Sequence, residues 1–577
     1  MMNEIADYSQ IWAVDFEFHQ MPGERPTPVC LVAKDLLSGQ VIRMWQDELL
    51  VRSEPPYPLA SDSLFVAYFA SAELGCHIAL GWPMPARILD LYAEFRCLTS
   101  GLPVLYGHGL LGALVHHGLP LGGSDFAQKD RMRERISQGG AYSDNEREAV
   151  LDYCQSDVEA VARLLPAMLP KIDLPRALVR GRYMAAVARM EWTGIPMDVE
   201  TLGQLRADWE SIRTRLIERV DRNYGVYEGR VFKADRWDDW LKKNNIIWPR
   251  LASGALALDD ETFKGVALKY PVIAPMRELR KTLSQLRPHA LAVGSDGRNR
   301  YRLSPFASKT GRNQPSSSKF IFGQPAWTRS LIKPAVGSAI AYVDYSQQEF
   351  GIAAALSGDT TMQEAYLSGD PYLQFAVQAG AAPPGATAET HGAVREQFKV
   401  CSLGVQYGMS AGSLARKLGR KLESGTELLR LHRETYPAYW KWSDAAQDYA
   451  ELHRKLTSVL GWSIHLTQNP NYRSIRNFPL QANGAEMLRL ACCLTVERGI
   501  QVAAPIHDAL LIEAPDGEID QVVTETQRIM REAAEFVLDG FALRTDAAII
   551  RNPDRYMDKR GEAMWRLASE LMGEIDG

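Results

Sequence analysis

The chain has 577 residues, which is too long for one hydrophobic core, so we expect three or four compact units. Its hydrophobic (46%) and charged (23%) fractions are typical of a soluble globular protein, and the sequence shows neither a signal peptide nor an apolar run long enough to cross a membrane. The seven cysteines lack C-x-x-C spacing, which argues against a zinc knuckle or a disulfide framework and favours buried thiols in a reducing cytoplasm.

The net charge of −5 argues at first against a nucleic-acid partner. The average conceals one basic stretch, because residues 296–333 contain eight basic side chains and a single acid. Phosphate binding depends on such a local patch rather than on the total charge. The stretch is therefore a candidate contact with nucleic acid, and a solvated surface is the alternative interpretation.

Residues 10–18 (IWAVDFEFH) are predicted to form the first strand, because apolar and aromatic side chains dominate them. Asp15 and Glu17 lie one residue apart, so both side chains leave the same face of this strand. Two carboxylates on one face can reach one metal ion. A polar strand end in solvent is the alternative interpretation.

Residues 143–165 are predicted to form a helix that begins with a capping box, Ser143-x-x-Glu146. A spacing of four places Tyr153 and Asp157 on one face of this helix. Three prolines then interrupt the pattern, and we place a domain boundary among them: Pro166, Pro170 and Pro175.

The rest of the chain is predicted to be mainly helical, with strands near two aspartates. The segments in chain order are helices over 176–290, loops and short strands over 294–325, a strand at 338–346, helices to about 455, and a hairpin over 501–515 with His507-Asp508 at its turn.

Asp344 and Asp508 are candidate ligands for a pair of Mg²⁺ ions. Asp344 ends an apolar strand, where a buried carboxylate is costly without a partner such as a metal. Mg²⁺ takes few protein carboxylates and completes its shell with water and substrate phosphates, so two aspartates can suffice. Taken alone, each residue is equally compatible with a helix cap or an ordinary turn.

A second candidate feature is a helical face formed by Arg395, Lys399, Leu403 and Tyr407, which follow one another at intervals of four. Two cations suit a triphosphate, because Lys and Arg stabilise charge on phosphoryl groups. An aromatic ring offers a stacking surface to a base. A solvated basic face is the alternative interpretation.

In order and surroundings, these segments resemble the family A (Klenow-type) DNA polymerases. Asp344–Glu349 (DYSQQE) resembles motif A, Arg395-x3-Lys399-x7-Tyr407-Gly408 resembles motif B, and His507-Asp508 resembles motif C. Further matching elements are Thr310-Gly311-Arg312, Ser357-Gly358-Asp359, the Arg473, Asn477 and Gln481 pattern, and Met190-Glu191 with Gly194. The likeness runs from about residue 176 to the C-terminus.

The resemblance implies a role for each matching position. Asp344 and Asp508 would bind two Mg²⁺ ions, with Mn²⁺ able to substitute, and Arg395 and Lys399 would grip the dNTP phosphates. Lys399 could also protonate the pyrophosphate, while Glu349 would exclude the ribose 2′-hydroxyl. Tyr407 would lie by the templating base, other dNTP contacts would come from Tyr345, Gln347 and Leu403, and DNA contacts would come from Arg312, Arg473, Asn477, Gln481 and His507.

Four positions depart from the family pattern. Ala509 replaces the last acid of motif C, and Leu403 stands where an aromatic residue is usual. Gly351 replaces an arginine and Tyr372 replaces a histidine, so altered dNTP contacts are expected. These departures favour a phage- or prophage-like member of the family.

The N-terminal acids resemble the DEDD-type 3′→5′ exonucleases. Asp15-x-Glu17 matches the first motif and Tyr153-x3-Asp157 the third, so Asp15, Glu17 and Asp157 would bind metal and Tyr153 would orient the attacking water. In VAYFASAEL (66–74), Glu73 takes the position of the usual aspartate and Phe69 that of an asparagine. Glu73 is the least secure metal ligand, and Asp90 is expected to be structural.

The predicted architecture is an α/β, RNase H-like exonuclease domain at 1–172, followed by a right-hand polymerase fold at 173–577. Within that fold the thumb would span about 176–290, the palm about 291–360 and 465–577, and the fingers about 361–464. The expected protein is a cytoplasmic monomer that binds primer–template DNA and dNTPs and has no 5′-nuclease domain.

Three other functions remain open from the sequence. A single-subunit RNA polymerase shares the palm and the R-x3-K helix, although Glu349 and the exonuclease-like segment argue against it. A non-catalytic DNA-binding factor is disfavoured by the retention of both palm aspartates with Arg395 and Lys399. The third is a nuclease whose polymerase half only holds substrate.

Overall fold

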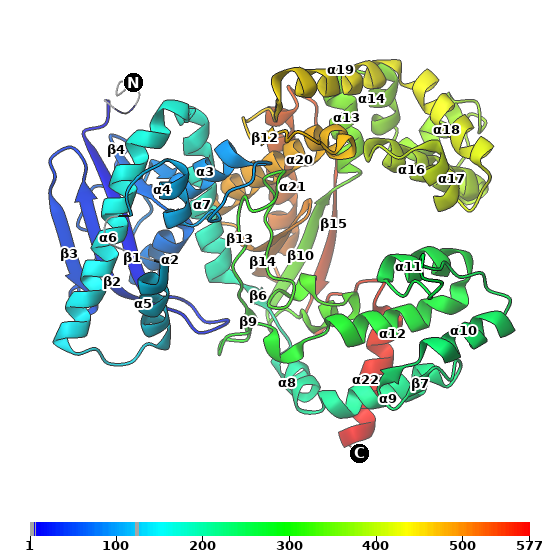
Figure 1. Ribbon diagram of the computed structural model, residues 1–577, viewed down its shortest axis with the longest axis horizontal. Coiled ribbons are helices and arrows are strands. Elements are labelled where there is room, and N and C mark those ends of the chain that lie inside the picture. Colours follow the sequence, from blue (N-terminus) through cyan, green and yellow to red (C-terminus); the bar gives the residue numbers. More distant parts are fainter. Residues whose placement is uncertain (1–4, 6, 122–125, 577) are drawn as a thin grey trace.

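The computed structural model describes residues 5, 7–121 and 126–576. In Figure 1 an N-terminal α/β part lies at the left, a sheet with long helices lies in the centre, and two helical lobes project to the right, one above the other. The polypeptide visits the lower lobe first and the upper lobe second.

The N-terminal part is built on a five-stranded mixed sheet with the order β3-β2-β1-β4-β5. β1 pairs antiparallel with β2 and parallel with β4. This sheet confirms the α/β class predicted for the N-terminal part. The strands are β1 (Gln10–His19), β2 (Thr27–Asp35), β3 (Val41–Trp45), β4 (Ser63–Ala67) and β5 (Ile88–Asp90).

Helices cover both faces of this sheet, and the alternation of β1 decides which side chains each face receives. Ile11 and Ala13 pack with α6, whereas Trp12 and Phe16 pack with α2. Asp15 and Glu17 continue the face that α6 covers. The helices are α1 (Gln46–Leu50), α2 (Ala70–Leu80), α3 (Leu91–Thr99), α4 (Leu110–His116), α5 (Phe126–Gln138) and α6 (Asp144–Met168).

The expected capping box opens α6: the Ser143 hydroxyl accepts from the Glu146 amide, and Glu146 accepts from the Ser143 amide at 2.8 Å. The helix continues through Pro166, where a break was predicted, and ends at Met168. Pro166 is exposed while Leu164 and Leu165 are buried, so packing of the apolar face offsets the lost backbone hydrogen bond.

The central sheet is antiparallel throughout, with the order β13-β14-β10-β15. Its strands are β10 (Ser338–Tyr345), β13 (Gln501–Ile506), β14 (Ala509–Pro515) and β15 (Thr545–Arg551). The long helices α20 (Tyr472–Glu497) and α21 (Ile519–Val537) pack beside it, and α7 (Leu174–Thr193) contacts both α20 and the N-terminal α2. The expected strand and hairpin are therefore present.

The upper lobe contains α16 (Ala388–Gln406), α17 (Ala411–Lys417) and α18 (Leu422–Thr435), and a group of helices joins it to β10. The joining helices and the hairpin that follows them are α13 (Gln348–Ser357), α14 (Thr360–Leu367), α15 (Pro371–Gln378), α19 (Pro437–His453), β11 (Lys455–Thr457) and β12 (Ser463–His465).

The lower lobe is also mainly helical, and the C-terminal helix α22 (Glu562–Asp576) returns to pack against its helix α9. Its other elements are α8 (Val199–Ala207), α9 (Trp209–Asp221), β7 (Tyr227–Glu228), β8 (Val231–Phe232), α10 (Ala234–Lys243), α11 (Asp260–Lys269) and α12 (Ala274–Gln285). A two-stranded pair, β6 (Ile195–Pro196) with β9 (Arg298–Asn299), connects the lobe to the central sheet.

Among the described residues, none of the helices combines the length and the apolar character needed to cross a membrane.

Candidate functional site

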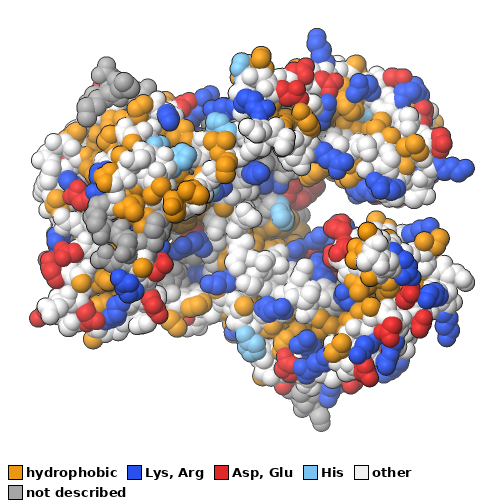
Figure 2. Space-filling model, viewed as in Figure 1, with side chains coloured by type: hydrophobic (Ala, Val, Ile, Leu, Met, Phe, Trp, Pro, Cys, Tyr) orange, Lys and Arg blue, Asp and Glu red, His pale blue; other side chains and the backbone are white. Residues whose placement is uncertain are grey.

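A cavity of about 760 Å³ lies where β10 ends and the β13–β14 hairpin turns. It belongs to the hollow between the two helical lobes, whose rims carry Lys and Arg side chains (Figure 2). Ten of the residues predicted for polymerase chemistry line it beside Tyr345: Arg312, Asp344, Gln347, Glu349, Arg395, Lys399, Leu403, Tyr407, His507 and Asp508.

Two carboxylates form the floor of this cavity. β10 pairs with β14 so that Asp344 lies opposite Ala509, and the amide of Tyr345 donates to the carbonyl of Asp508 at 3.3 Å. Burial and the nearby charge of Asp508 raise the pKa of Asp344 to about 6. Burial also raises the pKa of Asp508, against the opposing effect of Arg312. The two negative charges thus remain incompletely neutralised, as a site for divalent cations requires.

Asp344→Asn is expected to stabilise the metal-free protein at pH 8 by a few degrees in Tm. Folding raises the pKa of this carboxyl to about 6. Above that pH the ionised carboxylate therefore destabilises the folded state. The gain should shrink as the pH falls from 6 towards 4. Calorimetry in EDTA across this pH range measures the gain in Tm. Glu364→Gln, at an exposed position of α14, is the control. An equal gain at every pH would contradict the raised pKa.

α16 forms a cationic wall of the cavity, because its four-residue spacing directs Arg395, Lys399 and Leu403 to one side. Arg395 forms an ion pair with Asp370 and lies 5.8 Å from the ring centroid of Tyr372. Lys399 lies 3.8 Å from Glu396 and is partly exposed. Both cations are held by side chains at the rim and could exchange these partners for phosphate oxygens.

A hydrogen-bonded cluster closes one end of the cavity. The Tyr407 hydroxyl donates to Glu349 at 2.9 Å, and the Gln481 amide donates to both Glu349 and the Tyr407 oxygen. Burial raises the pKa of Glu349 above its ordinary value. The cluster fixes the Glu349 carboxylate at the cavity wall although α13, α16 and α20 are far apart in sequence.

The remaining predicted residues take different positions. The Tyr345 side chain turns into the core, where its hydroxyl donates to the Met530 carbonyl at 2.7 Å, so only its backbone faces the cavity. Gln347 accepts from Arg544 at 2.9 Å. Asn477 donates to the Gln406 carbonyl at 3.3 Å, and Arg473 is exposed one turn earlier on α20, outside the cavity lining.

Four of the eight basic side chains at 296–333 form ion pairs within the protein. Arg298 pairs with Glu513, Arg300 with Asp296 at 2.6 Å, Arg329 with Asp558 at 2.6 Å, and Lys333 lies 4.0 Å from Asp198. These four side chains have acidic partners within the protein, so composition alone overstated the nucleic-acid surface. Arg312 instead faces the cavity.

Sequence reasoning missed two charged groups near this cavity. Asp546 on β15 lies directly opposite Asp344, accepts from the Ser346 hydroxyl at 2.6 Å, and contributes to the raised pKa of Asp344. Lys417 of α17 lines the cavity beside α16. Neither belongs to a matching motif, and only the strand register and the helix packing bring them close.

The N-terminal acids form a second cluster. One ligand oxygen from each of Asp15, Glu17 and Asp157 lies within 4.8 Å of the others, the spacing of a metal site among the described residues. Burial and Asp157 raise the pKa of Asp15 to about 8, and burial followed by Asp15 raises that of Glu17. Tyr153 is buried beside them on α6. The strand and helix spacings thus bring these residues together as predicted.

Glu73 does not join this group. It arises from α2 and accepts from the Phe16 amide at 2.7 Å. Phe69, just before α2, has a left-handed backbone (φ 81°) and its ring packs 4.9 Å from that of Tyr92. Asp90 accepts from the amides of α2 and α3 at 2.5 and 2.6 Å, consistent with a structural role.

Lys129 and Cys154 were not identified from the sequence. Lys129 of α5 forms a buried ion pair with Asp157, and its ammonium lies 5.6 Å from the Tyr153 ring centroid. The Cys154 thiol donates to the Asp15 carboxylate at 3.3 Å. No sequence motif pointed to Cys154. Lys129 reaches the cluster only because α5 packs against β1.

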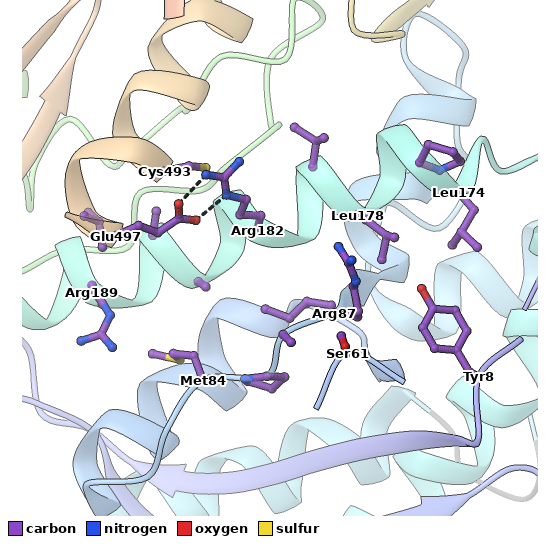
Figure 3. Close-up of a pocket in the computed structure, with 18 of the residues that line it drawn as sticks. Tyr8, Ser61, Met84, Arg87, Leu174, Leu178, Arg182, Arg189, Cys493 and Glu497 are labelled. Carbon is purple, nitrogen blue, oxygen red and sulfur yellow. Dashed lines mark hydrogen bonds and ion pairs between the residues drawn. The ribbon is translucent and has the colours of Figure 1, made fainter. Parts of the chain in front are cut away.

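A further cavity, of about 1160 Å³, lies away from both clusters (Figure 3). Residues of α7 and of the N-terminal part line it, and an ion pair between Arg182 and Glu497 lies on one side of it. Its lining includes Arg87 and Arg189 with apolar side chains. The cavity offers no group of carboxylates comparable to the other two sites.

The comparisons with known proteins agree with the geometry of the cavity that contains Asp344 and Asp508. Residues 321–551 match the family model of DNA polymerase family A. DNA polymerase I of Aquifex aeolicus is 26% identical over 419 residues, which cover 68% of this chain and 70% of that protein. The thermostable DNA polymerase I of Thermus thermophilus is 25% identical over 60% of this chain, which spans 44% of that enzyme.

The fold is shared with a solved polymerase. The polymerase domain of Pol1 from M. smegmatis, in complex with DNA primer-template and dNTP, superposes with a TM-score of 0.69 at 17% identity and covers 95% of this chain. The likeness confirms the predicted polymerase fold. Residues 321–551 of this chain therefore form a DNA polymerase domain of family A.

Proposed function

We propose that this chain is a template-directed DNA polymerase that extends the 3′ end of a primer with dNTPs. The observation that carries the proposal is the convergence of Asp344 and Asp508 with Arg395 and Lys399 on one cavity. The M. smegmatis structure contains primer-template and dNTP, which supports the same partners here.

In this proposal the central sheet is the palm, the upper lobe the fingers and the lower lobe the thumb. The assigned ranges are about 291–360 and 465–577 for the palm, 361–464 for the fingers and 176–290 for the thumb. Because α7 packs against both α2 and α20, the free part of the thumb would begin at α8.

Asp344 and Asp508 fit a pair of Mg²⁺ ions, since their incompletely neutralised carboxylates face a cavity that Arg395 and Lys399 also line. When bound, these ions stabilise the attacking and leaving oxygens of an in-line displacement. The primer 3′-hydroxyl gives its proton to solvent water, and its oxygen forms a bond to the α-phosphorus while the bond to pyrophosphate breaks. Arg395 and Lys399 hold the phosphates, and Lys399 supplies a proton to the pyrophosphate.

Glu349→Ala is expected to admit ribonucleotides. The Tyr407 and Gln481 hydrogen bonds hold the carboxylate at the cavity wall, where it would crowd a 2′-hydroxyl. We expect discrimination between dCTP and rCTP, measured as the ratio of kcat/KM values, to fall by about 100-fold, or about 3 kcal/mol. Glu364→Ala, on exposed α14, should leave the ratio unchanged. Undiminished exclusion by Glu349→Ala would place the selectivity elsewhere.

We further propose that the N-terminal part removes 3′-terminal nucleotides as a proofreading exonuclease. Asp15, Glu17 and Asp157 fit a divalent cation, because their oxygens already lie within 4.8 Å of one another. Tyr153 would orient the attacking water. Hydrolysis forms a bond from the water oxygen to phosphorus and breaks the bond to the 3′-oxygen.

Both activities can be tested in one assay with a 5′-labelled primer annealed to a longer template. With Mg²⁺ and dNTPs, template-length product is expected. With Mg²⁺ alone, shortening from the 3′ end is expected. Failure to extend with any divalent cation would refute the polymerase proposal, and extension with rNTPs in preference to dNTPs would replace it with an RNA polymerase.

A further inference from the structure

The proposed exonuclease centre contains a buried cation of its own. Lys129 contacts Asp157, and the side chains of the two residues are only 4% and 10% exposed. A buried ammonium is unfavourable unless it is paired, and the ion pair with Asp157 supplies that partner. Of the described α5 side chains, Lys129 is the deeply buried cation, whereas Arg131 and Arg133 are exposed.

The fourth carboxylate is displaced from this centre. Glu73 lies on α2, whose apolar residues pack on the opposite face of β1 from α6. Its carboxylate is engaged by the Phe16 amide at 2.7 Å, and its oxygens lie outside the 4.8 Å group. Glu73 therefore lies beside the centre, where its charge still acts on Glu17, but it does not join the group of oxygens that could share one ion.

The cations beside the carboxylates change the charge that the centre can balance. Four clustered carboxylates balance two divalent cations. When ionised, the three clustered carboxylates and the neighbouring Glu73 carry four negative charges. Lys129 and Arg133, which hydrogen-bonds to Tyr153, supply two positive charges, so one divalent cation neutralises the remaining charge of −2. A second divalent ion would also have to approach the Lys129 ammonium, and this repulsion acts in a buried setting where Coulomb energies are large.

We propose that Lys129 takes the place of one of two divalent cations, so that the exonuclease centre binds a single metal ion and uses the lysine as its second positive charge. The inference rests on the proposed exonuclease function. The Lys129 ammonium stabilises negative charge on the phosphate undergoing hydrolysis. The position 5.6 Å from the Tyr153 ring places it beside the residue expected to orient the water.

The number of bound ions is the first test. Mn²⁺ binding to the full chain is counted by EPR in an Asp344→Ala, Asp508→Ala background, which removes the polymerase ligands. One tightly bound Mn²⁺ is expected, and Asp15→Ala in the same background should abolish it. Two bound ions that both depend on Asp15 would overturn the proposal.

The second test removes the ammonium. In the otherwise unchanged chain, Lys129→Gln should slow 3′ shortening by about 100-fold at saturating Mn²⁺, and Lys129→Arg should recover part of the rate. Arg131→Gln, on an exposed position of α5, is the matched control. Unchanged primer extension by Lys129→Gln shows that the chain is folded. Shortening at the rate of the unchanged chain would refute the role of Lys129.

The two proposals fail in different ways. If the unchanged chain shortens no 3′ end with any divalent cation, the exonuclease function is wrong, while the Mn²⁺ count still judges the ion content of the centre. If shortening occurs with two bound ions, the exonuclease function stands and the role of Lys129 is wrong.

Discussion

Asp508→Ala is expected to abolish primer extension while leaving duplex binding intact. Asp508 and Asp344 face the same cavity, and burial with mutual repulsion leaves their charges incompletely neutralised. Removing one would take away a ligand for ions that stabilise both oxygens of the displacement, an effect worth several kcal/mol. At about 1.4 kcal/mol per tenfold, extension should fall by at least about 1000-fold.

The control for this prediction is Asp516→Ala, which removes an exposed carboxylate just beyond the same strand, β14. It should extend primers at the normal rate. Binding is measured by fluorescence anisotropy of a labelled primer–template, because phosphate contacts made by other residues should persist. Normal extension by Asp508→Ala would show that this carboxylate does not serve the reaction.

Asp15→Ala is expected to remove 3′ shortening and leave extension unchanged. Asp15 lies at the centre of the N-terminal cluster, where it is close to Glu17 and Asp157 and accepts from the Cys154 thiol. Loss of this ligand should lower the rate of shortening by at least about 1000-fold. The measurement is release of labelled 3′ nucleotides from single-stranded DNA.

Asp152→Ala is the matched control for the exonuclease, because Asp152 is an exposed carboxylate of α6 whose partner is Arg43. Its shortening rate should be normal. Persistent shortening by Asp15→Ala would assign the nuclease to another site, and loss of extension in the same variant would show that the two parts are not independent.

Simple periodicities predicted much of both sites. The alternation of β1 placed Asp15 and Glu17 on the face that α6 covers, and the four-residue spacing of α6 placed Tyr153 and Asp157 opposite them. The apolar strand before Asp344 and the hairpin around Asp508 became neighbours in one sheet. The strand alternation and the helical spacing are local, so the sequence contains their physical cause, whereas the pairing of β10 with β14 depends on the tertiary fold.

What the sequence did not predict depends on packing between distant elements. Lys129 meets Asp157 only because of the path of α5, and Asp546 meets Asp344 through the register of β15. The inward turn of Tyr345 follows from alternation along β10, since its neighbour Asp344 faces the cavity. The basic stretch was overestimated because composition does not reveal internal partners such as Glu513.

Anomalous diffraction from crystals of the full chain with primer–template, a non-hydrolysable dNTP and Mn²⁺ tests the central claim most directly. We expect manganese peaks between Asp344 and Asp508, with the triphosphate against Arg395 and Lys399. Peaks that contact neither aspartate, or a triphosphate bound away from α16, would contradict the account.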